Sequence, residues 1–86
     1  MQVLFSKIFE KSLRKLSKRD LEKIFSIIRL LESSSFPLSS NNIKPLHGHQ
    51  KAYRIRKGNI RLVFVVENQT AYIKEVGYRK DIYEGL

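Results

Sequence analysis

Apolar residues recur at helical spacing in the first third of the chain. Four of them follow one another at intervals of four, four and three residues and so share one face of a helix: Phe5, Phe9, Leu13 and Leu16. Ser17 then has the character of a helix N-cap, with Asp20 in the capping-box position three residues later. The apolar spacing resumes over residues 21–31 and forms a wider stripe. These patterns predict two antiparallel helices joined by a tight turn, with an apolar face that needs a partner layer.

The second half of the chain changes to the two-residue period of β-strands. Residues 33–50 are rich in Ser, Asn and Pro and show neither period, which predicts an irregular connector. Three strand-like runs follow, at residues 52–56, 60–67 and 70–79. Short turns at residues 57–59 and 68–69 separate them, so we expect a three-stranded antiparallel meander. The opening residues 2–5 are also strand-like and would pair at an edge of this sheet.

Two helices and a sheet whose apolar residues alternate with polar ones predict an α+β fold. We expect one domain over residues 1–86: an N-terminal strand and a two-helix hairpin packed on one face of a twisted antiparallel sheet, with a short C-terminal tail. A chain of 86 residues is too short to bury a second core. Alternation assigns four residues to the core face, namely Tyr53, Ile55, Leu62 and Phe64. Arg54, Arg56 and Arg61 then point to the opposite face.

The charge of the chain narrows the classes of partner. Seventeen Lys and Arg against eight Asp and Glu give a net charge of +9, spread along the chain, which favours nucleic acid or an acidic protein segment. Cysteine is absent, which excludes disulfide scaffolds, thiolate metal sites and cysteine nucleophiles. The longest uninterrupted apolar run, residues 62–66, is far shorter than a membrane span. We therefore expect a soluble cytoplasmic protein with no membrane partner.

The stretch YRIRKGNIRLVF, residues 53–64, concentrates arginine in a segment with strand character. A solvated charged face is the simplest explanation for Arg54, Arg56 and Arg61. No acidic residue lies within residues 51–65, however, and the planar guanidinium fork binds phosphate in a bidentate manner. An arginine cluster on a rigid sheet therefore favours phosphate binding.

A second basic cluster ends the chain in GYRKDIYEGL, residues 77–86. Arg79 and Lys80 lie between Tyr78 and Tyr83. Tyrosines beside arginines suit RNA, because a base can stack on the ring while the guanidinium holds the phosphate. We expect this cluster to reach the same face as the first one.

The whole chain resembles the RelE/ParE superfamily of toxins from prokaryotic toxin–antitoxin modules. The resemblance rests on a short strand, a helical hairpin, a connector ending in IKPLHG (residues 43–48), and the motifs YRIRKGNIRLVF and VGYRKDIY (residues 76–83), in this order and spacing. It implies a helical hairpin packed on a twisted antiparallel sheet and a cognate antitoxin protein as inhibitor. RelE-like members enter the ribosomal A site and cut mRNA, whereas ParE-like members inhibit DNA gyrase.

Position by position, the RelE-type catalytic residues correspond to Arg54, Arg56, Arg61, Arg79 and Tyr83, with Lys57, Lys80 and Tyr78 as further RNA or phosphate contacts. The resemblance implies attack of an RNA 2′-hydroxyl on the adjacent phosphate without a metal or a small-molecule cofactor. Because every matched catalytic position carries a residue suited to RNA cleavage, we expect a metal-independent, ribosome-dependent mRNA endonuclease that inhibits translation. A ParE-like gyrase inhibitor and a catalytically inactive RNA-binding module are the alternatives.

Two departures from the family pattern bear on the mechanism. The best-known nuclease has lysines at the positions of Arg54 and Arg56, and many relatives have histidine at that of Tyr78. Arginine effectively cannot lose its proton, so Arg54 and Arg56 suit phosphate clamping better than base catalysis. Histidine is a residue type suited to proton transfer, but the resemblance assigns His47 and His49 no role and no third ligand accompanies them for a metal. The acceptor of the 2′-hydroxyl proton is left open.

Overall fold

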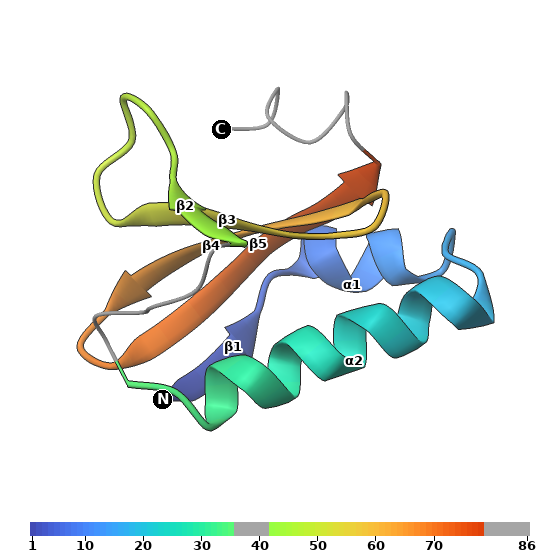
Figure 1. Ribbon diagram of the computed structural model, residues 1–86, viewed down its shortest axis with the longest axis horizontal. Helices are drawn as coiled ribbons and strands as arrows, with labels where there is room; N and C mark the ends of the chain where they lie inside the picture. The colour runs from blue at the N-terminus through green and yellow to red at the C-terminus, as the bar shows by residue number, and fades with distance from the viewer. Residues whose placement is uncertain (36–41, 79–86) are drawn as a thin grey trace.

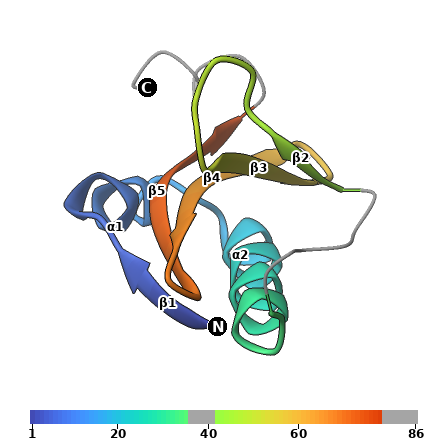
Figure 2. The same cartoon turned by 90° about the vertical axis from the view of Figure 1, so that its left-hand side faces the viewer.

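Two helices cover one face of a five-stranded sheet in the computed structural model, which describes residues 1–35 and 42–78 (Figure 1). The elements follow one another in the order β1 (Gln2–Phe5), α1 (Lys7–Leu13), α2 (Lys18–Glu32), β2 (Ile43–Pro45), β3 (Ala52–Lys57), β4 (Ile60–Glu67) and β5 (Thr70–Tyr78). The protein therefore has the α+β fold that the periodicity predicts, and Figure 2 shows how strongly its sheet twists between β5 and β2. Within the described residues, neither helix is long and apolar enough to cross a membrane.

The sheet contains both antiparallel and parallel pairs. Its strand order is β1-β5-β4-β3-β2, and the strands from β2 to β5 pair antiparallel with their neighbours. β1 instead pairs in parallel with β5, with Val3 beside Ala71. The predicted meander and the predicted N-terminal edge strand are both confirmed. The antiparallel arrangement holds for four strands, and the N-terminal strand makes the sheet a mixed one.

The predicted connector contains a strand of its own. Ile43–Pro45 forms β2 at the edge of the sheet, with Ile43 opposite Ile55 of β3. The irregular structure expected over residues 33–50 is therefore wrong at this point. Three residues are too few to display a two-residue period, so the pattern could not distinguish this strand from a loop.

Serine side chains set where the two helices begin. The Ser6 Oγ accepts a hydrogen bond from the Phe9 N–H at 3.0 Å and caps α1. The Ser17 Oγ accepts one from the Asp20 N–H at 3.2 Å, which confirms the N-cap predicted at Ser17. α1 is shorter than its apolar spacing suggests, since Phe5 already belongs to β1. The Phe5 ring still stacks on Phe9, with ring centroids 5.4 Å apart.

The core lies between the helices and the sheet. Side chains from both layers are fully buried there, the largest being Phe9, Ile24 and Leu31 from the helices and Ile60, Leu62, Phe64 and Ile73 from the strands. Tyr53 is half-buried and stacks on Phe64, with ring centroids 5.8 Å apart. Ile55, Leu62 and Phe64 therefore occupy the predicted core face, and Tyr53 borders it. This packed layer makes the opposite face of the sheet a rigid platform.

Candidate functional site

Three arginines project from the face of the sheet that points away from the helices. Arg56 lies directly opposite Arg61 across β3 and β4, and Arg54 lies opposite Val63. Their neighbour Ile55 is buried in the core, so alternation sends the arginines outward. The structure thus brings Arg54, Arg56 and Arg61 together on one face, as the sequence predicts.

A fourth cation belongs to the same face. Lys44 of β2 lies opposite Arg54, and the face that carries Lys44, Arg54, Arg56 and Arg61 is termed the arginine face below. The sequence pattern misses Lys44 because it does not reveal β2. Arg56 and Arg61 repel each other, because like charges directly opposite one another in a sheet are unfavourable. Within the described residues, Arg54 and Arg56 form no ion pair. Such a concentration of positive charge on a rigid surface favours the binding of an anion.

Glu75 is a carboxylate on the arginine face that the sequence pattern does not reveal. It lies opposite Val63, because a register shift leaves Lys74 without a partner in β4. Without this bulge, strict alternation from Ile73 would turn Glu75 into the core. The side chain is half-buried, and burial raises the pKa of its carboxyl above the usual 4.5. A carboxyl group with a raised pKa beside a cluster of arginines is suited to proton transfer.

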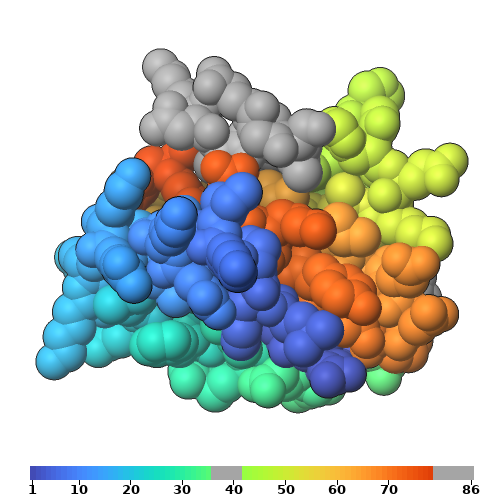
Figure 3. All heavy atoms as spheres, turned by 180° about the vertical axis from the view of Figure 1, so that it is seen from behind, coloured from blue at the N-terminus to red at the C-terminus, as the bar shows by residue number. Residues whose placement is uncertain are grey.

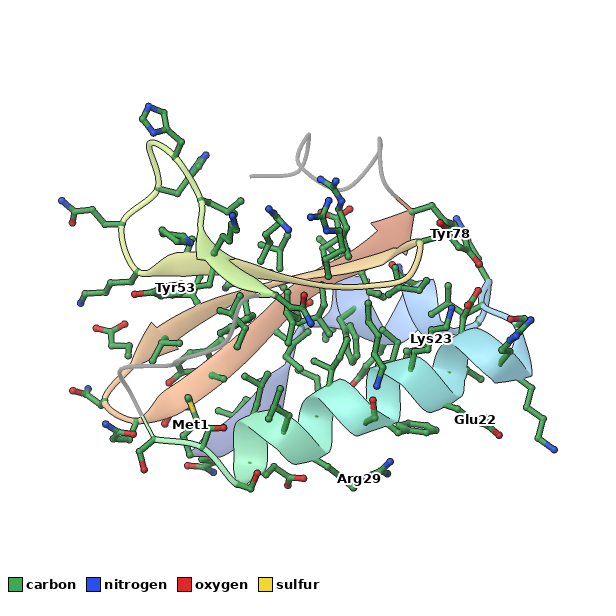
Figure 4. The ribbon with its side chains drawn as sticks, viewed as in Figure 1. Met1, Glu22, Lys23, Arg29, Tyr53 and Tyr78 are labelled. Atoms are coloured by element: carbon green, nitrogen blue, oxygen red, sulfur yellow. The ribbon has the colours of Figure 1, made fainter. Side chains whose placement is uncertain are left out.

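Tyr78 points to the helical side of the sheet, unlike the arginines (Figure 4). Its hydroxyl donates a hydrogen bond of 2.5 Å to Asp20 Oδ2 at the start of α2, and Lys23 Nζ lies 3.6 Å from Asp20 Oδ1. The bond from Tyr78 lowers the pKa of Asp20 from its usual 3.8, and the same bond raises the pKa of Tyr78 from its usual 10.0. The structure therefore does not bring Tyr78 together with the arginines. Its position indicates a link between β5 and α2.

Lys57 also lies on the helical side, where its Nζ donates a hydrogen bond to Ser26 Oγ of α2. It shares strand parity with the core residues of β3, so the structure does not place it with the arginines. Arg79, Lys80 and Tyr83 lie outside the described residues, and their roles stay predictions.

The two histidines lie in the turn that joins β2 to β3. Both His47 and His49 are exposed there. Within residues 1–35 and 42–78, no group of three or more His, Asp or Glu side chains is placed to hold a metal ion.

A pocket of ≈ 260 Å³ opens beside Glu75 at the edge of β5. α1 and the turn after it supply Ser12 and Lys15 to its lining, and β5 supplies Glu75 and Tyr78. Figure 3 shows this side of the molecule, where α1 lies against β5. The pocket approaches the size of a small-ligand site, ~300 Å³. Its cation, carboxylate and aromatic ring make it chemically suited to a nucleotide.

The chain has relatives among known toxins, although no family model matches it. It is 35% identical over 85 residues to Toxin RelE3 of Methanocaldococcus jannaschii, which covers 98% of this chain and 97% of the relative. It is 29% identical over 76 residues to Putative toxin RelE1 of the same organism, which covers 86% of this chain and 84% of the relative.

Solved structures share the fold. A chain of the RelB-RelE antitoxin-toxin complex from Methanococcus jannaschii superimposes with a TM-score of 0.79 at 33% identity, over 96% of this chain and 98% of that chain. A chain of the RelE-RelB complex from Pyrococcus horikoshii OT3 superimposes with a TM-score of 0.75 at 23% identity, over 93% of this chain and 96% of that chain. The isolated E. coli RelE toxin superimposes with a TM-score of 0.70 at 25% identity, over 98% of this chain and 92% of that chain.

Proposed function

This chain belongs to the RelE toxin family, and we propose that it is a ribosome-dependent endoribonuclease that cleaves mRNA in the A site and so inhibits translation. The reaction is attack of an RNA 2′-hydroxyl on the adjacent phosphate without a metal. The 2′-oxygen bonds to phosphorus and the bond from phosphorus to the 5′-oxygen breaks, which leaves a 2′,3′-cyclic phosphate and a 5′-hydroxyl. The protein must stabilise the negative charge that builds up on the phosphorane.

The arginine face is the observation that carries this proposal. Arg54, Arg56 and Arg61 share one surface of a packed sheet, with Lys44 beside them. Guanidinium forks bind phosphate oxygens in pairs, so this face can grip the scissile phosphate and neutralise its developing charge. A rigid support matters because preorganised donors need no rearrangement as the reaction proceeds.

An antitoxin that covers the arginine face would hold the toxin inactive. Chains with this fold occur in RelB-RelE complexes from Methanococcus jannaschii and Pyrococcus horikoshii OT3. The net charge of +9 on this chain favours an acidic or amphipathic segment as the inhibitor. The proposed partners are therefore a cognate antitoxin, the ribosome and its mRNA.

Cleavage on programmed ribosomes tests the proposal. Purified protein added to ribosomes with a defined message should cut within the A-site codon. Arg56→Ala, at an exposed position, should lower the cleavage rate ~10²- to 10³-fold, because one preorganised donor to the phosphate is lost. Arg29→Ala is the matched control, since Arg29 is exposed on α2 and points away from the sheet (Figure 4). This control should cleave at the wild-type rate.

Three outcomes would contradict the proposal in different ways. Intact message with stoichiometric protein, together with inhibition of gyrase supercoiling, would favour the ParE-like alternative. RNA binding with a steep salt dependence but without cleavage would favour an inactive binding module. Equal cleavage by the wild-type and Arg56→Ala proteins would remove the arginine face from the mechanism.

A further inference from the structure

The arginines leave the proposed reaction without a proton acceptor. Arginine stays protonated in proteins, so the guanidinium groups can hold phosphate but cannot take the 2′-hydroxyl proton. A general base must lose its proton near the working pH and lie within hydrogen-bond reach of the substrate. Among the described residues, two carboxylates share the face of the sheet with the arginines, Glu67 and Glu75.

These two carboxylates differ in burial and pairing. Glu67 is exposed at the last position of β4, and its Oε1 lies 3.6 Å from Lys51 Nζ. Glu75 is half-buried, and no hydrogen bond or ion pair to another described residue holds its carboxylate. Glu67 therefore belongs to an ordinary surface ion pair, whereas Glu75 is a partly desolvated carboxylate available to a ligand.

Glu75 also lies next to the phosphate clamps. Glu75 lies opposite Val63 of β4, and Val63 in turn lies opposite Arg54 of β3. Two residues further along β5, Gly77 lies opposite Arg61. Arg61 is a diagonal neighbour of Glu75, ~7–8 Å away, and Arg54 lies two strand spacings away. Long side chains can span both separations. The carboxylate and the guanidinium groups can therefore contact one nucleotide from the same face.

The pocket at the edge of β5 gives such a nucleotide access to Glu75. Its volume of ≈ 260 Å³ is bounded by Ser12, Lys15 and Glu75, and by the backbone around Gly77, which adds no side chain. A ribose bound there would lie against Glu75. The adjacent phosphate would then lie toward Arg61, the register partner of Gly77.

We propose that Glu75 is the general base of this protein, an inference that rests on the proposed RNA cleavage. The 2′-hydroxyl proton moves to a carboxylate oxygen of Glu75 as the 2′-oxygen forms its bond to phosphorus. The bond from phosphorus to the 5′-oxygen breaks, and the departing 5′-oxygen takes a proton from water. The arginines hold the non-bridging oxygens throughout and do not change protonation.

Charges around Glu75 set how the reaction depends on pH. Arg54 of β3 and Arg61 of β4 share the face of the sheet with Glu75, and Lys74 precedes it on its own strand. Ser12 and Lys15 from the α1 side line the same pocket, and Tyr78 lines it from the helical side of the sheet. The cations favour the carboxylate, whereas burial favours the carboxylic acid and raises the pKa of Glu75. The cleavage rate should therefore rise tenfold per pH unit on the acidic side and level off once Glu75 is ionised.

Single-turnover cleavage on ribosomes with saturating protein tests the role of Glu75. Glu75→Gln keeps the shape of the side chain and removes the base, so the rate should fall ~10²- to 10⁴-fold and the acidic limb of the pH profile should disappear. Affinity for the ribosome should stay the same. Glu75→Asp should recover part of the rate, and Glu67→Gln on the same face should cleave as the wild type does.

The outcomes separate this inference from the proposed function. A wild-type protein that does not cleave RNA would defeat both. Cleavage by the wild type with an equal rate for Glu75→Gln would overturn the inference alone. So would a Glu75→Gln protein that binds ribosomes more weakly but cleaves at the wild-type rate at saturation, because that is the behaviour of a binding residue.

Discussion

Glu75 reaches the arginine face because Lys74 has no partner across the ladder between β4 and β5. The extra residue reverses the alternation, so that Val76 enters the core in place of Glu75 and is only 4% exposed. The Ser6 hydroxyl donates a hydrogen bond of 2.6 Å to the Lys74 carbonyl at this point. β-Bulges beside functional sites commonly redirect one side chain. This one turns a carboxylate from the core toward the arginine face.

The raised pKa of Glu75 predicts how its replacement changes stability with pH. The unfolded chain releases this proton near the ordinary pKa of 4.5, whereas burial delays its release in the folded protein. The contribution of this proton to stability is therefore fully present below pH 4.5 and is lost as pH rises through the folded pKa. The free energy of unfolding of Glu75→Gln, relative to the wild type, should be higher at pH 7 than at pH 4.

Urea unfolding of both proteins at the two pH values checks this expectation. Glu67→Gln is the control, because Glu67 is an exposed carboxylate on the same face of the sheet. A Glu75→Gln difference that stays constant between pH 4 and pH 7 would mean that the folded protein ionises Glu75 as readily as the unfolded chain does.

At the scale of elements, β5 and α2 are joined through one side-chain bond. Tyr78 is the last residue of β5, and its hydroxyl binds Asp20 in the first turn of α2. A carboxylate at this position also interacts favourably with the positive end of the helix dipole. The bond thus holds the end of the strand against the start of the helix. It fixes the point from which the chain continues to Arg79.

Tyr78→Phe removes this bond and keeps the ring. The Asp20 contribution to stability is present above pH 3.8 and is lost as pH falls through its lowered pKa. The Tyr78 contribution is present below pH 10.0 and is lost as pH rises through its raised pKa. The variant should therefore be less stable than the wild type at pH 7, with a difference that shrinks at pH 2 and at pH 12.

Urea unfolding at the three pH values measures this difference. Tyr72→Phe is a matched control on the same strand, because Tyr72 is exposed and its hydroxyl has no hydrogen bond within the described residues. The control should unfold as the wild type does at every pH. A Tyr78→Phe protein as stable as the wild type at pH 7 would show that the bond to Asp20 is too solvated to hold the two elements together.

The sequence predicts the periodic elements and the N-terminal edge strand, and it misses one three-residue strand and the features that depend on non-local pairing. Alternation along Ile60–Glu67 assigns both faces of β4, and Ser17 with Asp20 marks the start of α2. The strand Ile43–Pro45 is too short to show a period. The bulge at Lys74 is a property of two paired strands, so the pattern of one strand cannot record it.

The same limits apply to the candidate site. The sequence places Arg54 and Arg56 correctly because both lie on one regular strand with a clear core face. Lys57 and Tyr78 are neighbours of the arginines in the chain, but each bonds to α2 on the other side of the sheet. Those contacts depend on how the helix crosses the strands. Glu75 is missed because its direction depends on the bulge.

At the scale of the whole molecule, positive charge borders the candidate site on two sides. Besides the arginine face, the turn between α1 and α2 and its flanks expose Arg14, Lys15, Lys18 and Arg19. None of these four forms an ion pair with a described residue. The pocket beside Glu75 lies between the two basic surfaces, with Lys15 in its lining. A field of one sign on both sides of a site steers a polyanion toward it.

Charge reversal at the helix turn should therefore slow association and leave the chemistry unchanged. Arg14→Glu combined with Arg19→Glu should lower the association rate with ribosomes ~10-fold or more at low salt, the lower end of electrostatic steering effects. The difference should fade as salt rises, because the Debye length falls from ~30 Å at 0.01 M to ~10 Å at 0.1 M. Stopped-flow mixing with labelled ribosomes measures the rate. The association rate of the neutral double variant, Arg14→Gln with Arg19→Gln, should lie between those of the wild type and the charge-reversed variant.

Single-turnover cleavage by the saturated double variant should match the wild type, since Glu75 and the arginine face are untouched. A slower association that persists undiminished at high salt would instead mean that the turn makes direct contacts with the ribosome. An association rate of the charge-reversed variant equal to that of the wild type at low salt would mean that the arginine face alone attracts the ribosome. In that case the basic side chains of the helix turn would be a solvated surface, as charged helix ends commonly are.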